Sequence, residues 1–251
     1  MKPSDPLLCH NYSHLIKRWR ALCRQAGLRM VKIGVTDGYP CFQITSPVLR
    51  REGGVYLSAG IHGDEPGAVL GLLSWAEKNE GKLSSLPLLI YPCLNPWGLE
   101  NNSRWDANGQ DLNRLWDASS PSPFTAKIMQ GLKTCTFSVS VCLHEDYDGQ
   151  GIYLYAPGGG KKVRGSATMI LSAGDKFIPR DPRKKIDGRK CSEGMIFPSP
   201  SRPPDDGIPE ALFLYENSGK HNFTLETPSE FAIEKRIVAQ VAMITEVINC
   251  L

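Results

Sequence analysis

The sequence contains no pair of cysteines separated by two residues, no long apolar run and no strong excess of charge. The eight cysteines are scattered, which argues against a zinc ribbon or a thioredoxin-type site. Most of them, such as Cys93 and Cys142, lie in apolar runs and are expected to be small buried side chains. A net charge of +3 does not by itself indicate nucleic-acid binding.

Two further absences concern location and chemistry. No apolar run approaches the about 20 residues that span a bilayer, and Asp5, His10 and His14 interrupt the start, which therefore lacks the apolar core of a secretory signal. We expect a cytoplasmic protein with reduced thiols, and no membrane or nucleic-acid partner. No G-x-S-x-G is present, and "GGGKKVRG" is not a phosphate loop, because Tyr155 and Lys162 replace the required Gly and Ser/Thr.

Strands alternate with helices along the chain. Apolar periodicity predicts helices over 11–28, 66–80, 122–133, 165–175 and 229–251, the last capped by Ser229. Strands are predicted over 29–35, 41–46, 54–60, 87–95, 137–144, 151–157, 210–216 and 222–227. Residues 96–117 are expected to be irregular, and 158–209 to form long surface loops around one helix. This order predicts a layered α/β sheet in one domain, 1–251, with 1–53 as an N-terminal helix and hairpin.

Four predicted strands end in polar residues: His62, Asn95, His144 and Glu226. Ligands bind at the carboxyl ends of strands in open α/β sheets, so these residues mark a candidate site. The spacing His62-x-x-Glu65 alone is common by chance. His144 directly follows an apolar strand, and two nitrogens with one carboxylate leave a fourth position for water, as in a catalytic zinc site. The alternatives are a structural histidine and a polar turn.

Other polar residues permit two interpretations each. Glu226 is either the general base that such a site needs or a carboxylate at the start of the last helix. Arg104, Asn113 and Arg114 lie in a Gly/Asn-rich stretch, where arginine suits carboxylate binding and carbonyl polarisation, although a solvated loop would contain the same residues. The basic run 180–190 is a solvated loop, or it recruits an acidic substrate if it borders the site.

These residues carry a resemblance to a family. "HGDE" (62–65), "NPWG" (95–98), Arg104, "DLNR" (111–114), His144 and "LETP" (225–228) occur in the order found in zinc carboxypeptidases. From about Gly54 onward the chain resembles the M14 metallocarboxypeptidase superfamily, which includes murein-peptide amidases and the succinylglutamate desuccinylase/aspartoacylase enzymes. The resemblance implies an α/β/α sandwich around a mixed sheet of about eight strands.

The resemblance also implies a role for each site residue. His62, Glu65 and His144 would bind one zinc ion, and Glu226 would act as general base and acid. Arg104 would polarise the scissile carbonyl, while Asn113 and Arg114 would bind the terminal carboxylate of the substrate. Tyr215 is the one phenol in the zone where digestive carboxypeptidases carry a mobile tyrosine. Trp97 replaces the usual Asp of the turn motif.

Three functions remain open on this basis. The first is hydrolysis of an amide bond beside a free carboxylate, by a carboxypeptidase or a peptide amidase, with a small peptide as substrate. The second is N-acyl amino acid deacylation by the same residues, which the short separation of His62 and His144 favours. The third is a binding domain of the same fold without activity. The sequence indicates neither the side-chain preference nor the oligomeric state.

Overall fold

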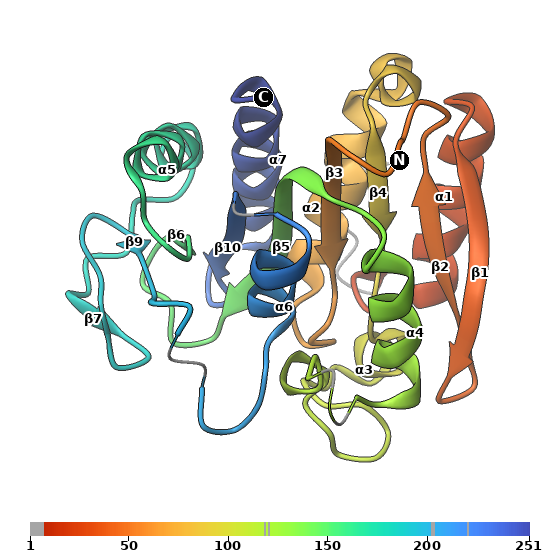
Figure 1. Cartoon of the computed structure of the whole chain (residues 1–251), viewed down its shortest axis with the longest axis horizontal. Helices are drawn as coiled ribbons and strands as arrows, with labels where there is room; N and C mark the ends of the chain where they lie inside the picture. Colours follow the sequence, from red (N-terminus) through yellow and green to blue (C-terminus); the bar gives the residue numbers. More distant parts are fainter. Residues whose placement is uncertain (1–7, 118, 120, 202–203, 220) are drawn as a thin grey trace.

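A computed structural model describes residues 8–117, 119, 121–201, 204–219 and 221–251, so the first seven residues of the predicted N-terminal segment lie outside it. Its centre is an eight-stranded mixed sheet in the order β1-β2-β4-β3-β5-β10-β6-β9, with β1–β2 at one end and β6–β9 at the other (Figure 1). The strands are β1 (Arg29–Thr36), β2 (Tyr39–Thr45), β3 (Gly54–Ala59), β4 (Leu88–Tyr91), β5 (Phe137–Asp146), β6 (Tyr153–Tyr155), β9 (Met195–Ile196) and β10 (Asn222–Pro228). A separate hairpin pairs β7 (Lys185–Ile186) with β8 (Arg189–Lys190).

Helices cover both faces of the sheet, and each face has its own apolar core. One face packs against α1 (Tyr12–Gln25), α2 (Pro66–Lys78), α5 (Lys161–Gly174) and α7 (Ile233–Asn249). The other packs against α4 (Pro123–Leu132) and α6 (Glu210–Asn217). The predicted α/β/α sandwich with a mixed sheet of about eight strands is therefore confirmed.

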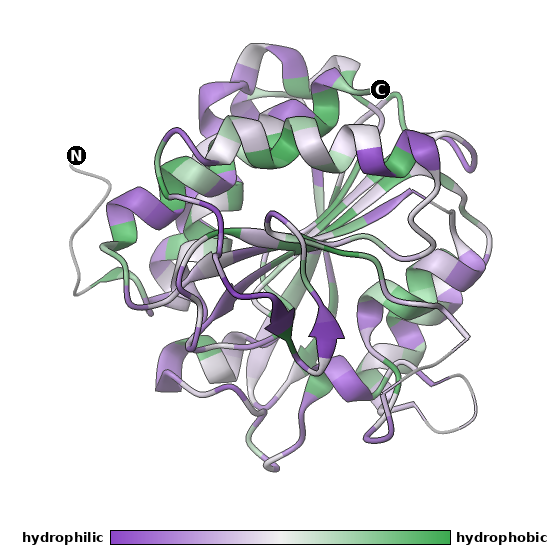
Figure 2. Cartoon of the chain, turned by 90° about the vertical axis from the view of Figure 1, so that its left-hand side faces the viewer, coloured by the Kyte–Doolittle hydropathy of each residue, from purple (hydrophilic) through white to green (hydrophobic). Residues whose placement is uncertain are grey.

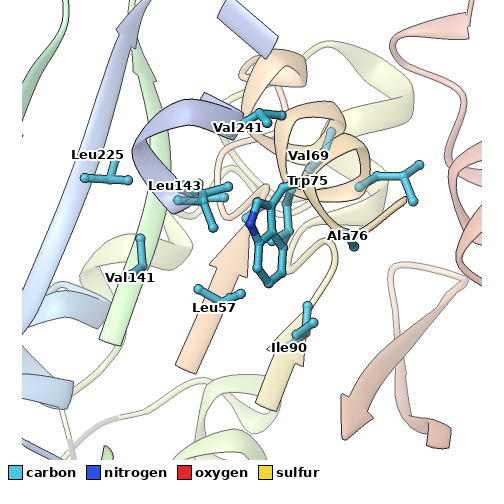
Figure 3. Close-up of a cluster of buried hydrophobic side chains, with 14 of the residues drawn as sticks. Leu57, Val69, Trp75, Ala76, Ile90, Val141, Leu143, Leu225 and Val241 are labelled. Atoms are coloured by element: carbon cyan, nitrogen blue, oxygen red, sulfur yellow. The ribbon is translucent and has the colours of Figure 1, made fainter. Parts of the chain in front are cut away.

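Trp75 of α2 illustrates how the first core is built. Its indole ring lies over Leu57 of β3 and Ile90 of β4, with Leu143 of β5 beside it (Figure 3). These side chains are almost completely excluded from water. Burial of each large apolar side chain contributes about 1.5–3 kcal/mol, so α2 is held firmly on the three central strands, whose ends carry the candidate site.

Four predictions about local structure are wrong or incomplete. Residues 210–216 form helix α6 and not a strand, because Pro209 starts a helix there and the short apolar run suits either structure. The stretch 96–117 contains helix α3 (Pro96–Asn101) and the 3-10 turn η3 (Leu112–Arg114). Helix α5 begins four residues before its predicted start. Ser229 does not cap α7, which begins after Ala232.

Among the described residues, no helix combines the length and the apolar character needed to cross a bilayer. Five of the eight cysteines are buried as predicted: Cys23, Cys41, Cys93, Cys142 and Cys191.

Candidate active site

Strand register places two of the candidate residues side by side. Glu226 of β10 is the direct partner of His144 in the parallel neighbour β5, and of Tyr153 in the antiparallel neighbour β6. Paired residues on adjacent strands project to the same face of a sheet. His144, Glu226 and Tyr153 therefore share one face, the one that also carries α4 and α6, near the carboxyl ends of β5 and β10.

The loop after β3 brings His62 and Glu65 to the same place. Gly60 adopts a φ of +64°, which a side chain would oppose. Gly63 makes a close approach instead: a Cβ there would lie 1.9 Å from the carbonyl carbon of Gly98 in α3. The loop then ends at Glu65, directly before Pro66 at the first position of α2. The two glycines thus let the loop turn and pack tightly against α3.

His62, Glu65 and His144 offer ligand atoms that all lie within 4.8 Å of one another, and all three residues are buried. The Nδ1 atoms of His62 and His144 lie 2.6 Å and 2.9 Å from the two carboxylate oxygens of Glu65. Three donors that converge from two elements onto one point, two of them imidazole nitrogens, fit a divalent transition metal such as zinc. The structure therefore brings the predicted metal ligands together.

Asp111, at the start of η3, is not among the residues that line the cavity, but it contacts His62 and orients its ring. Its Oδ1 lies 3.1 Å from His62 Nε2, and its Oδ2 accepts hydrogen bonds from Arg104 Nη2 at 2.9 Å and Nε at 3.2 Å. A carboxylate can only accept, so Nε2 of His62 carries a proton, and Nδ1, which lies 2.6 Å from Glu65 Oε1, is the nitrogen that would bind a metal after losing its own proton. Asp111 was part of the "DLNR" motif, but the sequence assigned it no role.

The pKa values of the group reflect its mutual contacts. Burial lowers the pKa of His62, but the charge of Glu65 and the hydrogen bonds that His62 donates to Asp111 and Glu65 outweigh burial and bring it to about 9. Burial raises the pKa of Glu65, and the two histidines lower it to about 2. In the metal-free protein, a proton on His62 therefore occupies the position that a cation would take.

Glu226 is buried in the same cavity. Its carboxylate receives no hydrogen bond from the residues that the structure describes, although backbone partners flank it on both sides. Burial raises its pKa well above the usual value; His144 opposes this shift, and Glu65, Asp146 and Asp187 add to it. A carboxyl group with a raised pKa can both take and give a proton near neutral pH.

Arg104, Asn113 and Arg114 line the same cavity as the candidate metal ligands His62, Glu65 and His144, which together are called the metal group below. Arg104 Nη1 makes no bond to Asp111 and lies 4.0 Å from Glu65, so it points toward the candidate ligands. Asn113 accepts a hydrogen bond from the backbone N–H of Glu210 through Oδ1. Because that partner is a donor, the amide orientation is determined and the NH₂ group is left for a ligand. Arg114 Nε donates to Asp206 at 2.7 Å.

The cavity has a volume of about 620 Å³ and extends past Glu226. The sequence did not indicate Tyr153 or Tyr155, but it left open that the basic run 180–190 borders the site, and Asp187 and Arg189 of this run do line the cavity. Tyr153 and Tyr155 of β6, Asp187 and Arg189 form its far wall. The positions of the two tyrosines depend on the pairing of β6 with β10, which no local pattern reveals. Tyr215 is not among the described residues that line the cavity: its phenol oxygen lies against Gly158, 2.5 Å from where a Cβ would stand.

Known proteins can now be compared with this arrangement. Residues 52–138 match the model of the succinylglutamate desuccinylase/aspartoacylase catalytic domain. Curated protein sequences give no match. A candidate metallopeptidase from Shewanella amazonensis SB2B superposes with a TM-score of 0.85 at 20% identity, covering 96% of this chain and 93% of the other. This chain has the zinc-carboxypeptidase fold.

Two further structures of the zinc-carboxypeptidase fold are similar over most of this chain. The metallo-carboxypeptidase from Burkholderia cenocepacia has a TM-score of 0.70 at 17% identity, covering 93% of this chain and 67% of the other. The metallo-carboxypeptidase from Pseudomonas aeruginosa, solved with (2-guanidinoethylmercapto)succinic acid, has a TM-score of 0.64 at 17% identity, covering 93% and 68%. The predicted resemblance to the M14 superfamily is confirmed at the level of the fold, and His62, Glu65 and His144 form a group that could hold a metal ion.

Proposed function

We propose that the protein is a zinc-dependent hydrolase that cleaves an amide bond next to a free carboxylate, of the metallocarboxypeptidase or peptide-amidase type. The observation that carries this proposal is the shared cavity. One cavity contains the candidate metal ligands, a carboxylate with a raised pKa and the arginines Arg104 and Arg114. Hydrolysis beside a carboxylate needs each of these groups, and a structural metal site would need only the first.

Each side chain has a distinct task in this mechanism. His62, Glu65 and His144 would hold zinc, which supplies a Lewis acid that polarises a carbonyl and lowers the pKa of water. Glu226 accepts a proton from the attacking water and later gives it to the leaving amine. Arg104 Nη1, which lies 3.3 Å from His62 Nδ1 and 4.0 Å from Glu65, would face the negative charge that develops on the carbonyl oxygen.

The remaining two polar residues position the substrate. The NH₂ group of Asn113 and the guanidinium of Arg114 would bind the terminal carboxylate, with Arg114 exchanging the exposed Asp206 for the substrate. The Pseudomonas aeruginosa relative of this fold was solved with a succinic acid derivative, which is consistent with a small carboxylate-bearing ligand. We also propose a cytoplasmic location, as the sequence analysis predicts.

A second candidate function is deacylation of N-acyl amino acids. The match of residues 52–138 to the succinylglutamate desuccinylase/aspartoacylase catalytic domain favours it. The mechanism above would remain unchanged, because the scissile bond is again an amide beside a carboxylate. Only the group on the acyl side differs. Incubation of the zinc-loaded protein with a panel of dipeptides and a panel of N-acyl amino acids distinguishes the two functions by which panel is hydrolysed.

The decisive variant is Glu226→Gln, which keeps the shape of the side chain and removes its ability to take a proton. Turnover should fall by about 10²–10⁴-fold, while zinc, measured by elemental analysis of the purified protein, stays near one ion per chain. Glu216→Gln makes the same chemical change at an exposed position on α6 and should leave turnover unchanged. Near-normal activity of Glu226→Gln would refute the proposal. A zinc-loaded wild-type protein that hydrolyses neither panel would support the inactive binding domain.

A further inference from the structure

The β7–β8 hairpin forms part of the cavity wall, although its sequence is a basic run. Asp187 and Gly188 at its tip adopt φ values of 47° and 72°, as a tight two-residue hairpin turn requires. Tyr155 of β6 donates a hydrogen bond of 2.5 Å to Asp187 Oδ2. Ile186 is buried against Tyr153, Cys191 and Ile196. The hairpin is thus fastened to the sheet at both its tip and its strand.

The pairing of the two strands determines which side chains face the cavity. Ile186 is directly opposite Arg189, and Lys185 is directly opposite Lys190. Opposed residues in an antiparallel pair project to the same face. Since Ile186 points inward to its apolar cluster, Arg189 also points inward, and it lines the cavity. Lys185 and Lys190 are exposed on the other face. Figure 2 shows this hydrophilic hairpin nearest the viewer.

Arg189 differs from the other two arginines of the cavity. Arg104 is bound to Asp111 and Arg114 to Asp206. The guanidinium of Arg189 has neither a hydrogen bond nor an ion pair with any residue that the structure describes, although the side chain is half-buried. A partly desolvated guanidinium without a partner is unfavourable, and its planar fork of donors matches a carboxylate.

We propose that Arg189 binds a carboxylate on the substrate's side chain, so that the preferred substrates carry an acidic side chain beside the scissile amide. This inference rests on the proposed function, which places the substrate's first carboxylate at Asn113 and Arg114. Arg189 lines the same cavity and would bind a second carboxylate of the substrate. The segment 180–190 contains six basic and two acidic residues. Its net positive charge attracts anionic substrates to this wall.

Asp187 is the feature that would oppose this assignment. It also lines the cavity, and a basic side chain would pair with it. However, its Oδ2 already accepts the hydroxyl of Tyr155, so Asp187 has a role in holding the turn. Asp146, the other carboxylate of this wall, is bound by Arg183 and Tyr153. Arg189 is therefore the charge of the wall that is left for a ligand.

Binding tests this inference without relying on hydrolysis. In the Glu226→Gln background with zinc, calorimetry compares N-benzoyl-Gly-Glu with its neutral isostere N-benzoyl-Gly-Gln, and N-acetylglutamate with N-acetylglutamine. The acidic probe of at least one pair should bind about 10-fold more tightly, as expected for a charge-assisted hydrogen bond at a partly exposed site. Arg189→Gln should remove this preference, and Arg189→Lys should retain part of it.

Lys190→Gln is the matched control, because it removes the same charge from the same hairpin on the outward face. It should preserve the preference for the acidic probes. Equal affinity for acidic and neutral probes, no binding of any probe, or tighter binding of N-benzoyl-Gly-Lys would overturn the inference. Preferential binding of the acidic probes by a wild-type protein that hydrolyses none of them would instead refute only the proposed function.

Discussion

Asp111 is the residue on which the candidate site depends most without lining it. Its two carboxylate oxygens contact His62 and Arg104, so one side chain orients both a candidate metal ligand and the group that would polarise the carbonyl. Such an outer carboxylate fixes the ring orientation and increases the basicity of the histidine. The position of Arg104 and the lone pair of His62 Nδ1 are thus coupled through a single residue.

We expect Asp111→Asn to weaken zinc binding by about 10–100-fold, because the neutral amide supports the His62 proton less well and no longer neutralises Arg104. Competition with a chromophoric chelator measures the zinc affinity. Asp148→Asn, which makes the same change at an exposed turn, provides the reference. An unchanged zinc affinity in Asp111→Asn would show that Asp111 has only a structural role.

Sequence reasoning identified individual residues at this scale better than the contacts between them. His62, Glu65, His144 and Glu226 could be found because each follows or ends an apolar strand. The role of Asp111 could not be predicted, since its partner His62 is distant along the chain. A hydrogen bond between distant residues does not alter the local sequence pattern around either of them. The same holds for Tyr153, which becomes a neighbour of Glu226 only through strand pairing.

At the scale of elements, the position of the metal group depends on the contact between the β3–α2 loop and α3. Gly63 lies against the Gly98–Leu99 peptide, where a Cβ would be 1.9 Å from one backbone atom and 2.2 Å from another. Backbone atoms cannot rotate away as a flexible side chain can. The loop carries His62 and Glu65, so any displacement moves two candidate ligands together.

Gly63→Ala should therefore lower the free energy of unfolding by about 1–3 kcal/mol, as overpacking does, and weaken zinc binding with it. Urea denaturation and chelator competition measure the two effects. Gly131→Ala in α4 is the contrasting change: nothing lies within 4 Å of its Cβ position, so the substitution should stabilise the protein by about 0.4–1 kcal/mol. Equal stabilities of the two variants would contradict the close approach.

Local signals also set the limit of what could be predicted about elements. The α1 helix, the β1–β2 hairpin and the start of α2 at Pro66 were predictable because periodicity, an Asp-Gly turn and a proline act within a few residues. Residues of helix α6 were predicted to form a strand, because a short apolar run such as Leu212–Leu214 is compatible with either a strand or a helix. Its helical state depends on Pro209 and on Asn113, which accepts the backbone N–H of Glu210 from a distant segment.

At the scale of the whole molecule, alternating strands and helices were sufficient to predict the layers, while the strand order was not predictable. Strand β5 pairs with β3 on one side and with β10 on the other. Because β5 lies between these two strands, His144 of β5 is close to His62 and Glu65 of the loop after β3 and to Glu226 of β10. The family resemblance implied that these residues meet at one site, but it did not supply the strand order, and composition and periodicity alone would have supplied neither.

The same convergence links metal binding to the stability of the entire fold. A ligand that binds only the native state stabilises it by about 2.7 kcal/mol at a concentration about 100 times its Kd. In the metal-free protein the pKa of His62 is raised from 6.5 to about 9. A raised histidine pKa contributes stability that is fully present below about pH 6.5 and is lost as the pH rises through about 9.

We therefore expect the metal-free protein to lose stability between about pH 6.5 and pH 9, while zinc binds more tightly over the same range because it no longer has to displace the proton on His62. The difference in Tm between zinc-loaded and chelator-treated protein should grow as the pH rises. Thermal unfolding of both forms across this range measures it, and His62→Gln should lack the pH dependence that His62 contributes. A difference in Tm that stays constant from about pH 6.5 to pH 9 would show that zinc does not compete with this proton, and would remove His62 from the metal group.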